Sequence, residues 1–152
     1  MLSPDFKEFV QLLNSFQVRY LVIGGYAVAY HGHPRYTKDL DIWLDVSQAN
    51  ARRMVAVLNE FGFASLRLTE ADFTEPNQVI QLGNPPLRID LLVGLATLSF
   101  RKCFASRIVA SLDGVEVNFI DLASLIQSKR SAGRTQDLAD VEQLERGPTK
   151  DS

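Results

Sequence analysis

The stretch YLVIGGYAVAYHGHPRYTKDLDIWL, residues 20–44, carries most of the information about the fold. It opens with a short apolar run that stops at Gly24-Gly25, as is typical of a strand buried on both faces. A short helix is expected from about Tyr26, and Gly32 and Pro34 end it because proline cannot continue the helical hydrogen bonds. The chain then extends again, with leucine and isoleucine alternating with aspartate. A strand, a glycine turn, a helix and a second strand therefore lie close together in the chain.

Outward from this unit, apolar spacing and capping residues predict the remaining elements. Ser3 and Pro4 begin an amphipathic helix, Ser47 caps another that ends at Gly62, and Asp113-Gly114 is a strong hairpin signal. The other predicted elements are strands over 78–82, 87–93, 107–112 and 115–120, a short helix over 97–104, a helix capped by Asp121, and a last helix with the stripe Leu138, Val141 and Leu144.

The alternation of helices and strands predicts an α/β (α+β) fold with a mixed β-sheet flanked by helices and a C-terminal helical pair. One domain is expected over residues 1–146, with a flexible tail at 147–152. The formal charge is -2, so any nucleic acid must bind to a local basic patch. The single cysteine, Cys103, favours a reducing cytoplasm, and no stretch approaches the roughly 18 apolar residues of a membrane span.

Two aspartates on one predicted strand are the first candidate site. Asp39 and Asp41 alternate with apolar residues, so both project from one face, and Arg35 and Thr37 share that face if extension begins near Arg35. Carboxylates at this spacing can converge on a hard cation such as Mg²⁺. A bare Asp-x-Asp is also common on solvated strand faces, which is the structural alternative.

A third aspartate, Asp90, interrupts the apolar strand predicted over 87–93. A buried aspartate usually has a partner. If this strand lies beside the first, three carboxylates would line one pocket and could hold two divalent ions. Gly24-Gly25 could cradle a triphosphate there, because glycine lets the backbone approach closely and the following helix offers free N–H groups. A purely steric role in the turn is the structural alternative for these glycines.

The order Gly24-Gly25, Asp39-Leu40-Asp41 and Asp90 resembles the signature of the polymerase-beta-like nucleotidyltransferase superfamily. More narrowly, residues 24–32 and 34–41 look like the AbiEii branch of bacterial abortive-infection and toxin-antitoxin nucleotidyltransferases. The C-terminal segment is similar to the Lys, Ala-x-x-Arg and Asp-x-x-Asp pattern of that branch, through Lys129, Ala132-Gly133-Arg134 and Asp137 to Asp140. The resemblance spans the chain from Tyr20 to Leu144.

The resemblance implies an enzyme that transfers a nucleoside monophosphate from an NTP to a hydroxyl of RNA (tRNA) or protein. Asp39, Asp41 and Asp90 would hold Mg²⁺ or Mn²⁺, and Gly24 and Gly25 would bind the triphosphate. Asp90 would also help to deprotonate the acceptor. A cognate toxin or antitoxin partner would follow from the branch.

Other residues have two interpretations each. Lys129 continues an apolar stripe and either contacts phosphate or a catalytic carboxylate, or extends to the surface along its methylene stem. Arg35 and Thr37 either touch phosphate or pair with the aspartates. Arg134, Asp137 and Asp140 fit helix capping and a short-range ion pair. Trp43 either stacks a base or packs in the core, and His31 and His33 are too few for zinc.

Two alternatives to an active nucleotidyltransferase stay open. A catalytically silent nucleotide-binding or antitoxin-like module could act through a protein partner. A sugar transferase also uses Asp-x-Asp, although the short chain and the glycine turn disfavour it. The sequence specifies neither the base, nor the acceptor, nor the oligomeric state.

Overall fold

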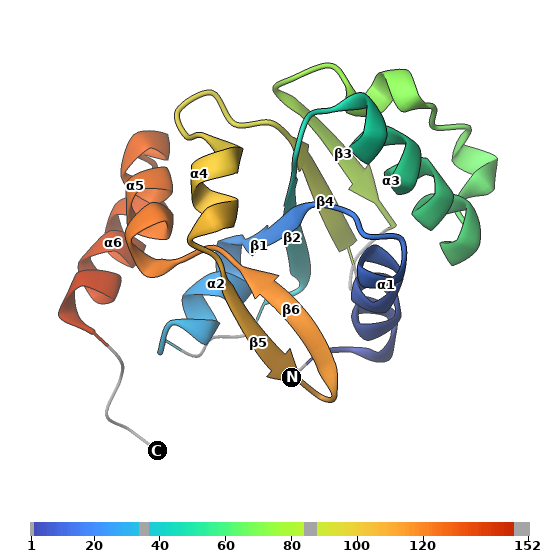
Figure 1. Cartoon of the computed structure of the whole chain (residues 1–152). Coiled ribbons are helices and arrows are strands. Elements are labelled where there is room, and N and C mark those ends of the chain that lie inside the picture. The colour runs from blue at the N-terminus through green and yellow to red at the C-terminus, as the bar shows by residue number, and fades with distance from the viewer. Residues whose placement is uncertain (1, 34–36, 84–87, 148–152) are drawn as a thin grey trace.

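The computed structural model describes residues 2–33, 37–83 and 88–147. These residues form six strands, six α-helices and two short 3₁₀ helices (Figure 1). The order is α1 (Pro4–Ser15), β1 (Tyr20–Ile23), α2 (Gly24–Tyr30), β2 (Asp39–Leu44), α3 (Gln48–Phe61), η1 (Ala64–Leu66), η2 (Glu70–Phe73), β3 (Gln78–Leu82), β4 (Arg88–Val93), α4 (Phe100–Ala105), β5 (Ile108–Leu112), β6 (Val115–Phe119), α5 (Leu122–Ala132) and α6 (Thr135–Arg146).

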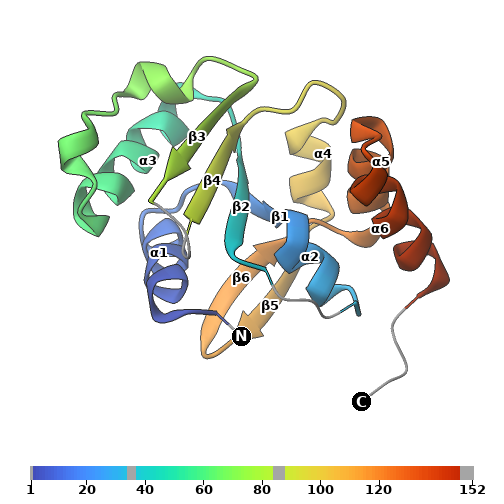
Figure 2. The same cartoon turned by 180° about the vertical axis from the view of Figure 1, so that it is seen from behind.

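The strands form one mixed sheet in the order β3-β4-β2-β1-β6-β5. The pair β2–β4 and the pair β1–β6 are parallel, whereas β1–β2, β3–β4 and β5–β6 are antiparallel. The helices α1 and α3 lie on one side of the sheet, and α4, α5 and α6 lie on the other (Figures 1 and 2). The predicted mixed sheet flanked by helices, with a C-terminal helical pair, is confirmed.

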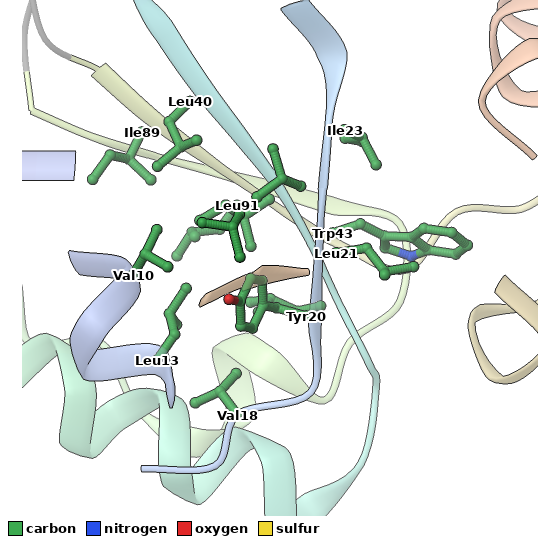
Figure 3. Close-up of a cluster of buried hydrophobic side chains, with 14 of the residues drawn as sticks. Val10, Leu13, Val18, Tyr20, Leu21, Ile23, Leu40, Trp43, Ile89 and Leu91 are labelled. Atoms are coloured by element: carbon green, nitrogen blue, oxygen red, sulfur yellow. The ribbon is translucent and has the colours of Figure 1, made fainter. Parts of the chain in front are cut away.

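The two faces of the central strands differ in polarity. Leu40, Ile89 and Leu91 point toward Val10 and Leu13 of α1, where they form part of the core (Figure 3). Because side chains alternate along a strand, the aspartates of β2 and β4 project from the opposite face. The core therefore anchors both strands and leaves their acidic face toward α5.

The local signals for helix ends behave as expected. The Oγ atoms of Ser3 and Ser47 accept hydrogen bonds from the backbone N–H groups of Phe6 and Asn50, at 3.2 and 3.1 Å. Gly62 ends α3 with φ +102°. The hairpin β5–β6 turns through Asp113 and Gly114, which both have positive φ, as the sequence predicted.

Two helix starts differ by two or three residues from the sequence predictions, and one predicted buried face is wrong. The helix expected from about Tyr26 begins at Gly24, directly after β1. The helix expected over 97–104 begins at Phe100, because the Oγ of Ser99 caps it. Leu138 is 51% exposed and does not belong to the buried stripe of α6. That stripe contains Asp137 and Asp140 with Val141 and Leu144, so its periodicity is partly acidic.

Some features of the sequence analysis lie outside the described residues: Pro34 and Arg35, the segment 84–86 between the strands predicted over 78–82 and 87–93, and the tail from residue 148. Thr37 is described and is not part of β2, which begins at Asp39. Within the part of the chain that the structure describes, none of the helices combines the length and the hydrophobicity that a membrane span requires.

Candidate active site

The parallel pairing of β2 and β4 brings together aspartates that are far apart in the sequence. Asp41 is the register partner of Asp90, and Asp39 is the register partner of Arg88. In parallel strands in register, the side chains of paired residues project from the same face. Asp39, Asp41 and Asp90 therefore line one cleft, as the sequence predicted.

Gly24 borders this cleft where β1 passes into α2. Its φ of +69° lies in the left-handed region, and a Cβ atom there would lie 2.1 Å from Oδ2 of Asp41. No side chain can occupy that space while the carboxylate stays in place. Gly24 therefore makes room for Asp41, whereas Gly25 is buried in the first turn of α2 and does not line the cleft.

The pKa of Asp41 is strongly shifted by the surroundings of this residue in the cleft. Burial, which is the largest cause, and repulsion by Asp90 and Asp39 together raise this pKa from 3.8 to about 7, against the attraction of Arg88. A carboxyl group in this state releases its proton readily when a cation arrives. Asp41 thus titrates in the physiological pH range.

Arg88 is the main feature that sequence reasoning missed. Its Nη2 atom donates hydrogen bonds to Oδ2 of Asp39 at 3.0 Å and to Oδ2 of Asp90 at 3.1 Å. Its Nε lies 3.0 Å from Oδ1 of Asp90, close enough for an ion pair but without hydrogen-bond alignment. The signal was available, because Arg88 stands two residues before Asp90 and so shares its face.

The cleft has a volume of about 530 Å³, which lies within the usual range for small-molecule sites. The sheet forms one wall with Gly24, the three aspartates and Arg88. Helix α5 forms another with Leu125, Ser128, Lys129 and Ala132, and the chain after β4 contributes Leu95, Ala96 and Thr97. The cleft therefore combines an acidic floor with an apolar and hydroxyl-bearing rim.

Lys129 lines the cleft but is already paired. Its Nζ lies 2.9 Å from Oδ2 of Asp140 and 3.5 Å from Oδ1 of Asp137, both nearly fully buried. Burial alone would raise the pKa of Asp137, but hydrogen bonds from Arg134 and the charges of Lys129 and Arg134 hold it below its usual value. The extended surface position considered for Lys129 is wrong, since its side chain is only 10% exposed.

The explanation of Asp137 and Asp140 by helix capping and a short-range ion pair with Arg134 is correct for Asp137 and wrong for Asp140. Asp137 does pair with Arg134, through a 2.6 Å contact between Oδ2 and Nε. Asp140 does not, because it faces Lys129 and accepts a hydrogen bond from Gln136 at 2.8 Å. The sequence placed these residues near a helix start but did not identify the lysine as their partner.

The remaining candidates lie as follows. The Oγ1 of Thr37 donates a hydrogen bond to the backbone carbonyl of Asp39 at 3.2 Å. Trp43 is fully buried and packs edge-to-face on Phe100, so core packing, not base stacking, is its role. A ring nitrogen of His31 contacts the carbonyl of Ile120.

The described part of the chain contains no group of three or more His, Cys, Asp or Glu side chains arranged to hold a metal ion. The aspartates share a cleft, yet two of them are turned to Arg88. The expected meeting of the three aspartates at one cleft is therefore observed, while a ready-made three-ligand geometry is not.

Two solved structures share this fold. One is a protein from Thermotoga maritima provisionally assigned as a nucleotidyltransferase, with TM-score 0.59, 14% identity and 96% of each chain covered. The other is an antigenic nucleotidyltransferase-like protein from Paracoccidioides brasiliensis, with TM-score 0.53 and 18% identity, covering 94% of this chain and 77% of that one. The curated proteins gave no match.

The sequence also matches a family model, described as aminoglycoside-2''-adenylyltransferase, over residues 5–91. The matched region is more than half of the chain and contains Gly24, Asp39, Asp41 and Asp90. This match, together with the fold and the acidic cleft, shows that the chain belongs to the aminoglycoside-2''-adenylyltransferase family of nucleotidyltransferases.

Proposed function

We propose that the protein transfers a nucleoside monophosphate from an NTP to a hydroxyl group in a reaction that depends on Mg²⁺ or Mn²⁺. The observation that supports this most strongly is the register of Asp41 with Asp90, next to Asp39, on the floor of a cleft of nucleotide-compatible size. Phosphoryl-type transfer requires mainly positioning of the reactants and neutralisation of negative charge.

The chemistry of the site fits a divalent cation. Three carboxylates and one guanidinium, all ionised, sum to -3 and +1, an excess of two negative charges. Carboxylate oxygens are the ligands that Mg²⁺ prefers. Asp39, Asp41 and Asp90 would hold the cation, which would neutralise charge on the nucleotide phosphates. The raised pKa of Asp41 supports this assignment, because a cation would replace the proton that relieves the repulsion.

The side chains and backbone of this protein would then do the following. As the resemblance implies, Gly24 at the cleft and Gly25 behind it in the first turn of α2 would support the triphosphate through their backbone. Lys129, Arg35 and Thr37 are the proposed phosphate contacts, and Lys129 would have to share its charge with Asp137 and Asp140. Asp90 accepts the proton of the acceptor hydroxyl. The hydroxyl oxygen forms a bond to the α-phosphorus, and the bond from that phosphorus to the bridging oxygen breaks, so that pyrophosphate leaves with its electron pair.

The hydroxyl that receives the nucleoside monophosphate could belong to one of three classes of acceptor. The resemblance to AbiEii proteins favours a hydroxyl of RNA, especially tRNA, or of a protein, within a toxin-antitoxin or abortive-infection system with a cognate partner. The family description adds a third class, an aminoglycoside hydroxyl. We favour a macromolecular acceptor, because the resemblance to AbiEii proteins extends to Lys129, Arg134 and Asp137, beyond the residues 5–91 that match the aminoglycoside family model.

One observation favours a second candidate function, a catalytically silent nucleotide-binding module. Arg88 already neutralises part of the acidic cluster through Asp39 and Asp90. If that ion pair persisted with nucleotide bound, the aspartates would not be free to act in transfer. The two candidates differ in turnover, not in nucleotide binding.

Transfer of label distinguishes them. The full chain is incubated with each α-³²P-labelled NTP, Mg²⁺ or Mn²⁺, and either total RNA, cell protein or an aminoglycoside. We expect wild type to label one acceptor, and Asp90→Asn to lower the rate at least about 100-fold. The matched control is Asp45→Asn, which removes an aspartate paired with Arg19 and outside this cleft; it should keep its activity.

Three other results would each contradict a part of the proposed function. Wild-type protein that labels none of the three acceptors with any NTP contradicts the proposed transfer. Nucleotide binding that persists in that inactive wild type and in Asp90→Asn supports the silent module instead. A rate that is the same in Asp90→Asn and wild type removes Asp90 from the mechanism.

A further inference from the structure

Arg88 links two aspartates that come from different strands. Asp39 lies beside it in register on β2, and Asp90 follows two positions later on β4. One guanidinium nitrogen, Nη2, contacts both carboxylates, and Nε adds a second contact to Asp90. The planar fork of arginine lets two of its nitrogens contact the carboxylate of Asp90 at the same time, which the single nitrogen of a lysine cannot do.

The position of Arg88 coincides with the position that a cation would need. The carboxylate oxygens that face the guanidinium belong to the same aspartates that the proposed function assigns to a divalent cation. The third aspartate, Asp41, lies against Gly24 and attracts Arg88 without forming an ion pair with it. The carboxylate lone pairs that accept hydrogen bonds from the guanidinium are not available to a metal ion, and two positive charges on the same carboxylates repel each other.

No other cation within the described residues could take over this role. The two remaining basic side chains that line the cleft, Lys129 and Arg134, are ion-paired with the acids of α6. Among the ion pairs of the described chain, those of the aspartate trio are made by Arg88 alone. Its own side chain is 30% exposed, so it has room to leave.

We propose that Arg88 is the resident counter-ion of the aspartate trio and that divalent cations bind by displacing it from Asp39 and Asp90. This inference rests on the proposed function for the identity of the cation site. Its consequence is that free cations bind weakly, since each must break a charge-assisted contact. The phosphates of a nucleotide offer the released guanidinium a second anionic partner, so that cation and nucleotide favour each other.

A direct test follows the arginine side chains by NMR. In ¹⁵N-labelled wild type, the Nε–H signals of Arg88, Arg19 and Arg134 each report an ion pair. Titration with Mg²⁺ should move the Arg88 signal toward that of an unpaired arginine and leave the other two in place. The Arg88 signal is assigned by its loss in Arg88→Lys. An unmoved Arg88 signal, while backbone amides of β2 show that Mg²⁺ is bound, overturns the proposal.

A second test measures Mn²⁺ affinity by electron paramagnetic resonance without nucleotide. Arg88→Gln should bind Mn²⁺ at least about tenfold more tightly than wild type, because the competing charge is gone. Arg88→Lys keeps the charge but not the fork, and we expect an intermediate affinity. The matched control is Arg52→Gln, which removes an exposed arginine paired with Glu70 and should leave the affinity unchanged.

Affinities that stay equal or fall in both Arg88 variants overturn the proposal. If Arg88→Gln fails to fold, as judged by circular dichroism, Arg88→Lys alone decides by the same criterion. The outcome is separable from that of the proposed function. Wild type that transfers nucleotide while Arg88 stays paired contradicts only this inference, and displacement of Arg88 by Mg²⁺ in a protein that transfers nothing contradicts only the transfer.

Discussion

Gly24 has a left-handed backbone conformation and lies directly against the carboxylate of Asp41 in the cleft. Replacement by alanine adds a Cβ atom in contact with the carboxylate of Asp41 and imposes a positive φ on an L-residue. The conformational term costs about 1–2 kcal/mol, and the clash adds to it. We predict that Gly24→Ala lowers the free energy of unfolding by more than about 3 kcal/mol, measured by urea denaturation.

The matched control is Gly62→Ala. Gly62 also has a positive φ, +102°, but an added Cβ atom meets nothing within 4 Å. Only the conformational cost remains, so the loss should be about 1 kcal/mol. Equal losses in the two variants would show that the approach to Asp41 has no energetic importance.

The pKa of Asp41 predicts how stability depends on pH in the absence of metal. Folding raises this pKa from 3.8 to about 7, so between these values the folded protein keeps a proton that the unfolded chain releases. The free energy of unfolding should therefore fall as the pH rises from about 4 to about 7. Urea denaturation in EDTA across this range measures the slope.

Asp41→Asn supplies the comparison, because asparagine is uncharged at every pH in this range. Its contribution to the slope should vanish, and the variant should be more stable than wild type near neutral pH. A wild-type slope that persists unchanged in Asp41→Asn would assign the titration to another group.

At the scale of elements, the pairing of α5 with α6 depends on a buried ion pair. Lys129 on α5 contacts Asp140 on α6 at 2.9 Å, and the Asp140 side chain is 1% exposed. Removing one partner of a buried pair leaves the other charge uncompensated. We predict that Asp140→Asn costs about 3 kcal/mol of unfolding free energy, measured by urea denaturation.

The same two helices provide the control. Arg130 on α5 pairs with Glu145 on α6 at 2.7 Å, with side chains that are 57% and 51% exposed. Solvent screens this pair, so Glu145→Gln should cost about 0.5 kcal/mol or less. If Asp140→Asn costs no more than Glu145→Gln, burial does not govern the contact between these helices.

At the scale of the whole molecule, ligand binding should stabilise the fold. A ligand that binds only the folded protein adds about 2.7 kcal/mol at 100 times its Kd. We predict that Mg²⁺ with a non-hydrolysable NTP analogue raises the Tm of wild type. The double variant Asp39→Asn/Asp41→Asn should show no such rise, because it lacks two of the proposed cation ligands.

Differential scanning calorimetry at several ligand concentrations measures this effect and separates binding from turnover. A rise in Tm without transfer of label supports the silent module. An equal rise in the double variant would mean that the nucleotide binds elsewhere on the protein.

Much of the architecture could be predicted locally. Periodicity located most helices and strands, and Ser3, Ser47 and Asp113-Gly114 marked their ends, because capping and turn chemistry depend on neighbours in sequence. The shared face of Asp39 and Asp41 follows from strand alternation in the same way. The order of Gly24, these aspartates and Asp90 was sufficient to indicate the nucleotidyltransferase superfamily.

Which charges face each other across different elements is set by tertiary packing. The contact of Arg88 with Asp39 depends on the register of β2 with β4, and the burial of Asp140 against Lys129 depends on how α6 packs on α5. Leu138 was misassigned for the same reason, since a buried ion pair occupies the stripe that apolar spacing would give to it. Ion pairing across elements is set by distances in space, and no spacing along the chain encodes those distances.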